Sequence, residues 1–282
     1  MTPRFVLAAL CWLAAASPLL AQQRPLVTED PETIGAGRVL IEGGVDAAHG
    51  VSYPVSGLKG NLWRVPTIGI SVGISSIAEL QIDGGLYDSL SITSRNPAAP
   101  LVSLLTVTGD RTHSFEDTIV ATKIRILSES TGRPAIGIRF ATKLPNATNE
   151  SGLGLDTTDF FASVLGAKTV ESIRVVANIG VGILADPTNG NRQNDVLTYG
   201  LSFARAMTQR TEVVGELNGR LSVRSGDPFP GTESRGLLKL GGRFTQGPVR
   251  FDGGVFLGLT TVDPTIGFTV GFTYVFNAFT LP

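Results

Sequence analysis

The sequence predicts an all-β fold: a transmembrane, antiparallel, up-and-down β-barrel of about 12 strands, preceded by a cleaved signal peptide. Segments of about nine to twelve residues alternate between apolar and polar side chains, which is the length and period of a tilted membrane strand. Short and long connections alternate between these segments. Beyond residue 21, no apolar run reaches the roughly 20 residues that a membrane helix needs. A membrane-embedded chain of this kind must close its strands into a barrel, because lipid cannot satisfy free backbone groups.

Residues 1–21 have the pattern of a secretory signal peptide. Arg4 precedes an apolar run over residues 5–16, and the small residue Ala21 marks the expected cleavage site. The only cysteine, Cys11, lies inside this run, so the mature chain would carry no thiol. Disulfides, thiolate catalysis and cysteine metal sites are therefore excluded. With 23 basic and 24 acidic residues, the chain gives no electrostatic reason to expect a nucleic-acid partner.

Residues 22–37 contain Pro25 and Pro31 and lack alternation, which disfavours a strand. We expect them to form an N-terminal arm that stays in the periplasm or enters the lumen. The barrel would then span residues 38–276, and residues 277–282 would form a C-terminal tail.

The predicted strands form an even series, as in single-chain bacterial barrels. They are residues 38–48, 62–74, 77–87, 116–128, 135–145, 158–167, 172–184, 195–206, 211–222, 235–245, 248–259 and 267–276. The short connections, expected to be periplasmic turns, are residues 75–76, 129–134, 168–171, 207–210 and 246–247. The longer ones, rich in Gly, Pro, Asn and Asp, would be outside loops: residues 49–61, 88–114, 146–157, 185–194, 223–234 and 260–266.

Charged and aliphatic side chains occupy alternate positions, which separates the lumen face from the lipid face. In residues 77–87, for example, Glu79 and Asp83 alternate with Leu80 and Ile82. A Lys or Arg facing lipid near the midplane would cost about 2–4 kcal/mol, so the charges are assigned to the lumen. The strand over residues 158–167 has adjacent apolar pairs, and its register stays open. The candidate pore-lining residues are Glu42, Asp46, Glu79, Asp83, Lys123, Arg125, Arg139, Lys143, Glu212, Glu216, Arg220, Lys239, Arg243 and Arg250.

Two interpretations of these charges stay open. The early strands carry acidic residues and the next two carry basic ones, so opposed rows of charge could orient solutes at a constriction. Alternatively, Glu79 or Asp83 pairs with Lys123 or Arg125 across neighbouring strands, and salt bridges fill the lumen.

The last strand, residues 267–276, places an aromatic or aliphatic residue at every second position. Gly271, Tyr274 and Phe276 resemble the closing-strand signal by which bacterial outer-membrane barrels are recognised for insertion. We therefore expect a location in the bacterial outer membrane, with lipid and the barrel-insertion machinery as partners. This strand should pair with the first one, near residues 39–45.

Three segments resemble an outer-membrane transporter family of the MetA-pathway-of-phenol-degradation type. They are the arm from Arg24 to Gly35, the stretch from Lys143 to Phe160, and the last hairpin, with Phe251-Asp252-Gly253-Gly254 and the ending from Gly271 to Phe276. The resemblance implies a passive channel or transporter for small organic solutes, aromatic or hydrophobic compounds among them. The alternative is a structural or adhesive barrel with a plugged lumen and partner-binding loops. We expect a monomer in either case.

Catalysis is not expected from the sequence. The two histidines, His49 and His113, lie at the edges of long loops, and Ser114 next to His113 points away from it on an extended chain. Two histidines also make a zinc site improbable. The sequence thus predicts no enzyme, no cofactor and no metal.

Overall fold

A computed structural model of the chain describes residues 24–280. The predicted signal peptide, with Arg4, Cys11 and Ala21, lies outside the described residues, as do the last two residues of the predicted tail.

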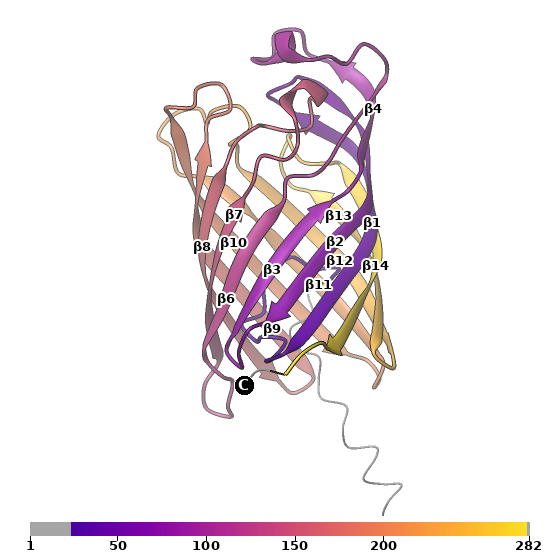
Figure 1. Cartoon of the computed structure of the whole chain (residues 1–282), viewed down its shortest axis with the longest axis vertical. Coiled ribbons are helices and arrows are strands. Elements are labelled where there is room, and N and C mark those ends of the chain that lie inside the picture. The colour runs from indigo at the N-terminus through magenta and orange to yellow at the C-terminus, as the bar shows by residue number, and fades with distance from the viewer. Residues whose placement is uncertain (1–23, 281–282) are drawn as a thin grey trace, which may run out of the picture.

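Twelve strands form a closed antiparallel ring, which confirms the predicted fold class (Figure 1). The first strand pairs with the last, so that Leu40 lies opposite Val275 and Val45 opposite Val270. The ring consists of β1 (Arg38–Tyr53), β2 (Leu58–Gly73), β3 (Ala78–Gly85), β6 (Ile119–Leu127), β7 (Ala135–Lys143), β8 (Asp159–Val170), β9 (Ile173–Ala185), β10 (Gln193–Ala206), β11 (Thr211–Ser222), β12 (Arg235–Gln246), β13 (Val249–Gly258) and β14 (Ile266–Asn277).

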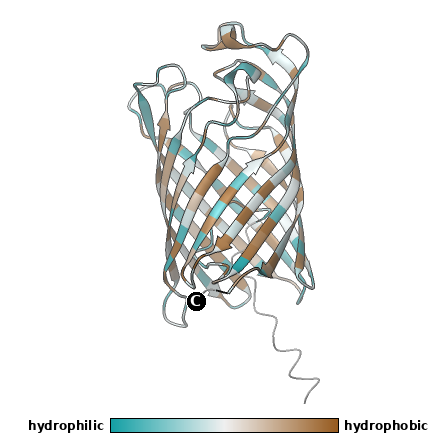
Figure 2. Cartoon of the chain, in the orientation of Figure 1, coloured by the Kyte–Doolittle hydropathy of each residue, from teal (hydrophilic) through white to brown (hydrophobic). Residues whose placement is uncertain are grey.

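Apolar and polar side chains alternate along the strands, which gives the barrel wall an apolar outer face and a polar inner face. On β14, Phe272 is 42% exposed on the outer face while its neighbour Thr273 is fully buried on the inner one. Figure 2 shows hydrophobic positions alternating with hydrophilic ones along the strands. The outward aliphatic and aromatic side chains suit lipid, and the inward polar ones suit a lumen.

The two ends of the barrel differ. Short turns close the end at which β1 begins and β14 finishes, and longer loops close the other end (Figure 1). In outer-membrane barrels the short turns are periplasmic, so the long loops lie outside. Within residues 24–280, no helix is long and apolar enough to cross a membrane.

At the outer end of the barrel, two segments predicted as loops contain strands. Residues 49–61 are largely strand, because β1 continues to Tyr53 and β2 begins at Leu58. Residues 88–114 contain β4 (Asp88–Arg95), the short 3-10 helix η1 (Val102–Leu104) and β5 (Arg111–Ser114). β4 pairs with the outer half of β2, whose inner half pairs with β3.

The prediction failed here because the apolar side chains of these outer segments face inward and the polar ones outward, the reverse of the pattern in the membrane-spanning strands. Val51, Leu58, Leu62 and Leu90 face inward and form a buried cluster, while Lys59 faces solvent. This apolar-inside pattern belongs to a water-soluble sheet, and it interrupts the lipid-facing pattern from which the strand limits were predicted.

The open register of the strand over residues 158–167 is settled by β8. Phe160 and Val164 are exposed on the outer face, whereas Leu165 and Ala167 are buried on the inner face. The adjacent apolar pairs arise because apolar residues occupy both faces of this strand. A second 3-10 helix, η2 (Asn149–Ser151), lies in the outer loop between β7 and β8.

Candidate functional site

The arm, residues 24–37, runs through the lumen at mid-height before it joins β1. It has no partner strand, so its backbone must find polar partners on the wall. Val27 and Thr28 both donate their amides to the Glu216 carboxylate, the first at 2.8 Å. The Glu29 amide donates to Oδ1 of Asn178 at 2.6 Å, and Nδ2 of Asn178 donates to the Glu29 carbonyl at 2.8 Å. Wall side chains thus replace a sheet ladder.

Arg24 is the cationic end of this crossing. Its guanidinium donates to the hydroxyls of Thr67 at 3.1 Å and Thr269 at 2.9 Å, and lies 3.4 Å from the Asp252 carboxylate. The space it occupies exists because two wall positions lack side chains. A Cβ added at Gly44 would lie 2.2 Å from Nη2 of Arg24, and one at Gly271 would lie 2.5 Å from its Nε. The wall therefore holds a fitted socket for the guanidinium.

Glu29 lies at the centre of a buried ion network. Its carboxylate is 3.3 Å from the Lys123 ammonium and 3.1 Å from the Arg139 guanidinium. Lys123 has no exposed side-chain surface and also contacts Glu79 at 3.0 Å. Gln81 bridges the network by donating to both carboxylates. Each buried charge of this network is paired, as burial requires.

The arm then descends towards the periplasmic end. Asp30 binds Arg174 through both carboxylate oxygens, with one contact of 2.6 Å, and Glu32 pairs with Arg125. The Ile34 amide donates to Glu79 at 2.7 Å. The Ile34 side chain packs with Leu40 and Val275, and this small buried cluster anchors the end of the arm.

Arg174 has a second partner in the periplasmic turn, Glu129, at 2.9 Å. Burial opposes ionisation of this carboxyl, but hydrogen bonds from Thr169 and from Arg174 hold the pKa of Glu129 below its usual range. The turn thereby steadies the guanidinium that holds Asp30.

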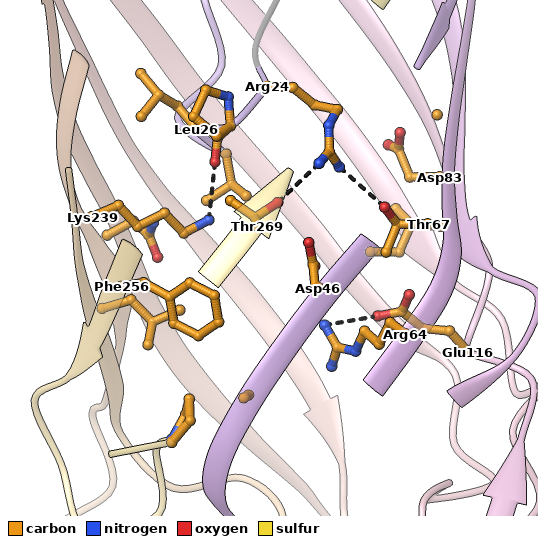
Figure 3. Close-up of a pocket in the computed structure, with 18 of the residues that line it drawn as sticks. Arg24, Leu26, Asp46, Arg64, Thr67, Asp83, Glu116, Lys239, Phe256 and Thr269 are labelled. Atoms are coloured by element: carbon orange, nitrogen blue, oxygen red, sulfur yellow. Dashed lines mark hydrogen bonds and ion pairs between the residues drawn. The ribbon is translucent and has the colours of Figure 1, made fainter. Parts of the chain in front are cut away.

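Two cavities lie on opposite sides of the arm. The outer cavity has a volume of about 540 Å³, and the residues from Arg24 to Val27 and Glu29 form its floor (Figure 3). The inner cavity, towards the periplasm, has a volume of about 270 Å³. Leu26 lines both cavities, so the arm is the partition between them.

The predicted pore-lining residues fall into groups by their contacts. Glu79, Lys123, Arg125, Arg139 and Glu216 hold the arm, as described above. Arg243 donates to the Arg24 carbonyl at 2.8 Å and pairs with Glu212 at 3.4 Å, and Lys239 lies 3.4 Å from the Pro25 carbonyl.

Of the remaining predicted residues, Glu42 contacts the first residue of the arm, and the others bind elsewhere in the lumen or line its cavities. Glu42 accepts a hydrogen bond from Thr273 at 3.0 Å and another from the Arg24 amide. Asp46 and Asp83 line the outer cavity, and Arg250 the inner one. Lys143 pairs with Asp159 at 2.9 Å, and Arg220 donates to the carbonyls of Glu233 and Gly231.

Both interpretations of the charges omitted the arm. Glu79 does pair with Lys123 across neighbouring strands, as the salt-bridge interpretation expects. The basic side chains of β6, β7 and β9, however, are neutralised largely by Glu29, Asp30 and Glu32 of the arm. The acidic run of the arm is thus complementary to the wall.

Arg174 and Asn178 were not predicted from the sequence as lumen residues, although both bind the arm. They occupy alternate positions of β9, opposite the outward Val175 and Ile179, so the period-2 pattern could have found them. Their partners Glu29 and Asp30 could not be found this way, because the arm has no alternation.

Among residues 24–280, no group of three or more His, Cys, Asp or Glu side chains is arranged to hold a metal ion.

The fold resembles those of solved outer-membrane proteins. An outer membrane channel from Pseudomonas putida F1 matches with a TM-score of 0.63 and 12% identity, over 88% of this chain and 98% of that chain. The NanC porin matches with a TM-score of 0.52 and 6% identity, over 84% of this chain and 98% of that one. These identities show a shared fold alone. The predicted bacterial outer-membrane location is confirmed by this fold and by the apolar outer face.

No family model and no curated protein sequence matches the chain.

The prediction that the chain is not an enzyme is corrected. Solved structures with a related barrel include outer-membrane enzymes, among them LpxR from Salmonella typhimurium, with a TM-score of 0.43 and 10% identity over 84% of this chain and 99% of that one. The likeness is too distant to assign an activity.

Proposed function

We propose that this protein is a passive outer-membrane channel for small organic solutes, in which the arm forms the constriction. The observation that carries the proposal is the pair of cavities, about 540 Å³ and 270 Å³, separated by the arm at Leu26. A solute that enters from outside meets the arm as the barrier between the two spaces. Eight of the fourteen predicted pore-lining residues line one of the two cavities, which supports this path: Glu42, Asp46, Asp83, Arg139 and Lys239 in the outer cavity, and Glu212, Arg243 and Arg250 in the inner one.

The contacts that hold the arm support a barrier that a passing solute can displace. These contacts are mainly hydrogen bonds and ion pairs to wall side chains, and the apolar cluster that the arm joins, Ile34 with Leu40 and Val275, is small. Water and polar groups of a solute can replace these contacts one at a time, at a net cost of about 0.5–1.5 kcal/mol for each neutral hydrogen bond and about 1.5–3 kcal/mol for each one to a charged group.

The lining of the outer cavity supports the proposal that the solutes are organic molecules and not simple ions. Leu26, Val51, Leu62 and Phe256 give it apolar wall area beside its charged side chains. This mixture is typical of sites for small organic molecules. The resemblance of the arm to the start of MetA-pathway-type transporters supports the same class of solute.

The alternative, a structural or adhesive barrel with a plugged lumen, also expects the arm inside. The cavities on both sides of the arm do not favour it, nor do a channel and a porin among the structures of similar fold. We further propose that the protein acts as a monomer, is inserted by the barrel-insertion machinery through Gly271, Tyr274 and Phe276, and works without cofactor, metal or nucleic acid.

Liposome swelling with purified mature protein tests the proposal. Liposomes that contain the protein should swell in small organic solutes faster than empty ones, and the rate should fall as solute size increases. Planar bilayers should show discrete conductance steps. The absence of both uptake and conductance would contradict the proposal.

A further inference from the structure

The outer cavity carries more negative than positive charge. Five basic and seven acidic residues line it, which gives a formal net charge of −2. In a partly enclosed space, where charges are poorly screened, such an excess favours cations over anions.

Most of these acids already have partners. Glu116 pairs with Arg64 at 3.4 Å, Asp117 with Lys143 at 3.2 Å, and Asp83 with Arg139 at 3.7 Å. Asp263 accepts the Thr260 hydroxyl at 2.7 Å.

Asp46 differs from them. No hydrogen bond or ion pair joins its carboxylate to another residue in the part of the chain that the structure describes, and its buried Oδ1 has no partner. Asp46 lies on β1 opposite Thr269 of β14 and Arg64 of β2, and its side chain projects into the cavity (Figure 3). The nearby cations are already engaged: Arg64 with Asp88 and Glu116, Arg24 with Asp252, and Lys239 with Glu216 at 3.8 Å.

Apolar side chains lie across the same space. Phe256 of β13 and Leu26 of the arm line the cavity with Asp46 (Figure 3). A molecule that presents a donor to Asp46 would therefore place its remaining atoms against apolar surface. Pairing would also supply the partner that a buried carboxylate oxygen needs.

We propose that the outer cavity binds an amphipathic organic cation, whose ammonium group donates to Asp46 and whose apolar body packs against Phe256 and Leu26. The inference rests on the proposed channel function, since it names the class of solute that the outer cavity collects. Asp46 is a specificity-determining residue in this account, and Phe256 contributes affinity without charge preference.

Three probes with one body and different heads test the charge preference. Benzylammonium, benzyl alcohol and benzoate are titrated by calorimetry into the folded mature barrel in neutral detergent. Benzylammonium should bind about tenfold or more tightly than the other two, because only its ammonium can donate a charge-assisted hydrogen bond to the Asp46 carboxylate. Equal binding of the three probes to the wild-type barrel would overturn the inference, and this comparison needs no variant.

Variants assign the preference to Asp46. Asp46→Asn should bring benzylammonium to the affinity of benzyl alcohol. Asp195→Asn makes the same change of charge at an exposed position of β10, where it should leave the preference intact. Phe256→Ala should weaken all three probes alike. An unchanged preference in Asp46→Asn, or an equal loss in Asp195→Asn, would contradict the assignment.

Binding in detergent requires no transport, so the two proposals fail separately. Wild-type protein that conducts but does not prefer benzylammonium would overturn this inference and leave the channel standing. Protein that prefers benzylammonium but passes no solute would overturn the channel alone.

Discussion

Lys123 shows how single residues organise the lumen. Its ammonium lies between Glu29 of the arm and Glu79 of β3, at 3.3 Å and 3.0 Å, with no exposed side-chain surface. A buried cation of this kind is tolerated only because both carboxylates face it. One residue thus ties the arm to the wall and balances one carboxylate of the arm and one of β3.

Lys123→Met should lower the free energy of unfolding by about 3–5 kcal/mol, because it leaves the buried Glu79 carboxylate without its cation and takes one cation from the nearby Glu29, which keeps Arg139. Denaturant titration of the barrel in lipid vesicles measures the change. The double variant Lys123→Met/Glu79→Gln should recover part of the loss. A change below about 1 kcal/mol in the single variant, which is typical of exposed pairs, would contradict the account.

Arg24→Ala should release the start of the arm from its socket. Each charge-assisted hydrogen bond contributes about 1.5–3 kcal/mol, so the displaced population should rise about tenfold or more. Single-channel recording should then show longer or larger open events than in the wild type. Arg111→Ala, at an exposed position of β5, is the matched control and should behave as the wild type.

At the scale of elements, the arm is the part of the molecule whose position decides function. It is fixed by wall residues far along the chain, such as Asn178, which is 149 residues from Glu29. The strands were predictable because their alternation is local. The path of the arm was not, because its sequence is compatible with either the periplasm or the lumen, and tertiary contacts decide between them.

A disulfide between Thr28→Cys and Gly200→Cys tests whether the arm must move. A Cβ at Gly200 would lie 3.3 Å from the Cβ of Thr28, close to the roughly 3.5–4.5 Å of disulfides. Because the Thr28 hydroxyl has no hydrogen-bond partner, its loss removes no bond. Solute uptake into liposomes should be lower in the oxidised than in the reduced protein, whereas Thr28→Cys alone should not respond to reduction. Equal uptake in both redox states would show that solutes pass a fixed arm.

The outer loop after β9 should loosen in acid. Asp186 accepts the Thr188 amide at 2.8 Å and pairs with Arg192 at 2.7 Å. Although burial opposes ionisation, these contacts hold the pKa of Asp186 below its ordinary value of 3.8. The ionised carboxylate therefore stabilises the loop above that value, and the stabilisation is lost as the pH falls through the lower folded-state pKa.

Amide hydrogen exchange at Thr188 measures this loosening. Exchange, corrected for its intrinsic pH dependence, should be slow at neutral pH and accelerate below about pH 4. Asp186→Asn should exchange faster at neutral pH and lose the acid response. Protection that persists in acid would contradict the assigned role of the carboxylate.

At the scale of the whole molecule, the ring closes because β14 pairs with β1 over its full length, from Arg38 opposite Asn277 to His49 opposite Ile266. Strand number, closure and the lipid-facing side followed from the sequence, since lipid imposes one rule on every strand. The outer hairpins did not, because Leu58 and Leu90 obey the opposite rule of a water-soluble core. The two cavities could not be predicted either, since they arise from where the arm lies.

The central claim is that the arm is the constriction of a conducting lumen. Single-channel conductance of the mature protein, compared with that of a variant lacking residues 24–34, tests it most directly. The account predicts a small conductance for the complete chain and a clearly larger one for the deletion variant. Identical conductance in two equally folded proteins, or no conductance in either, would contradict it.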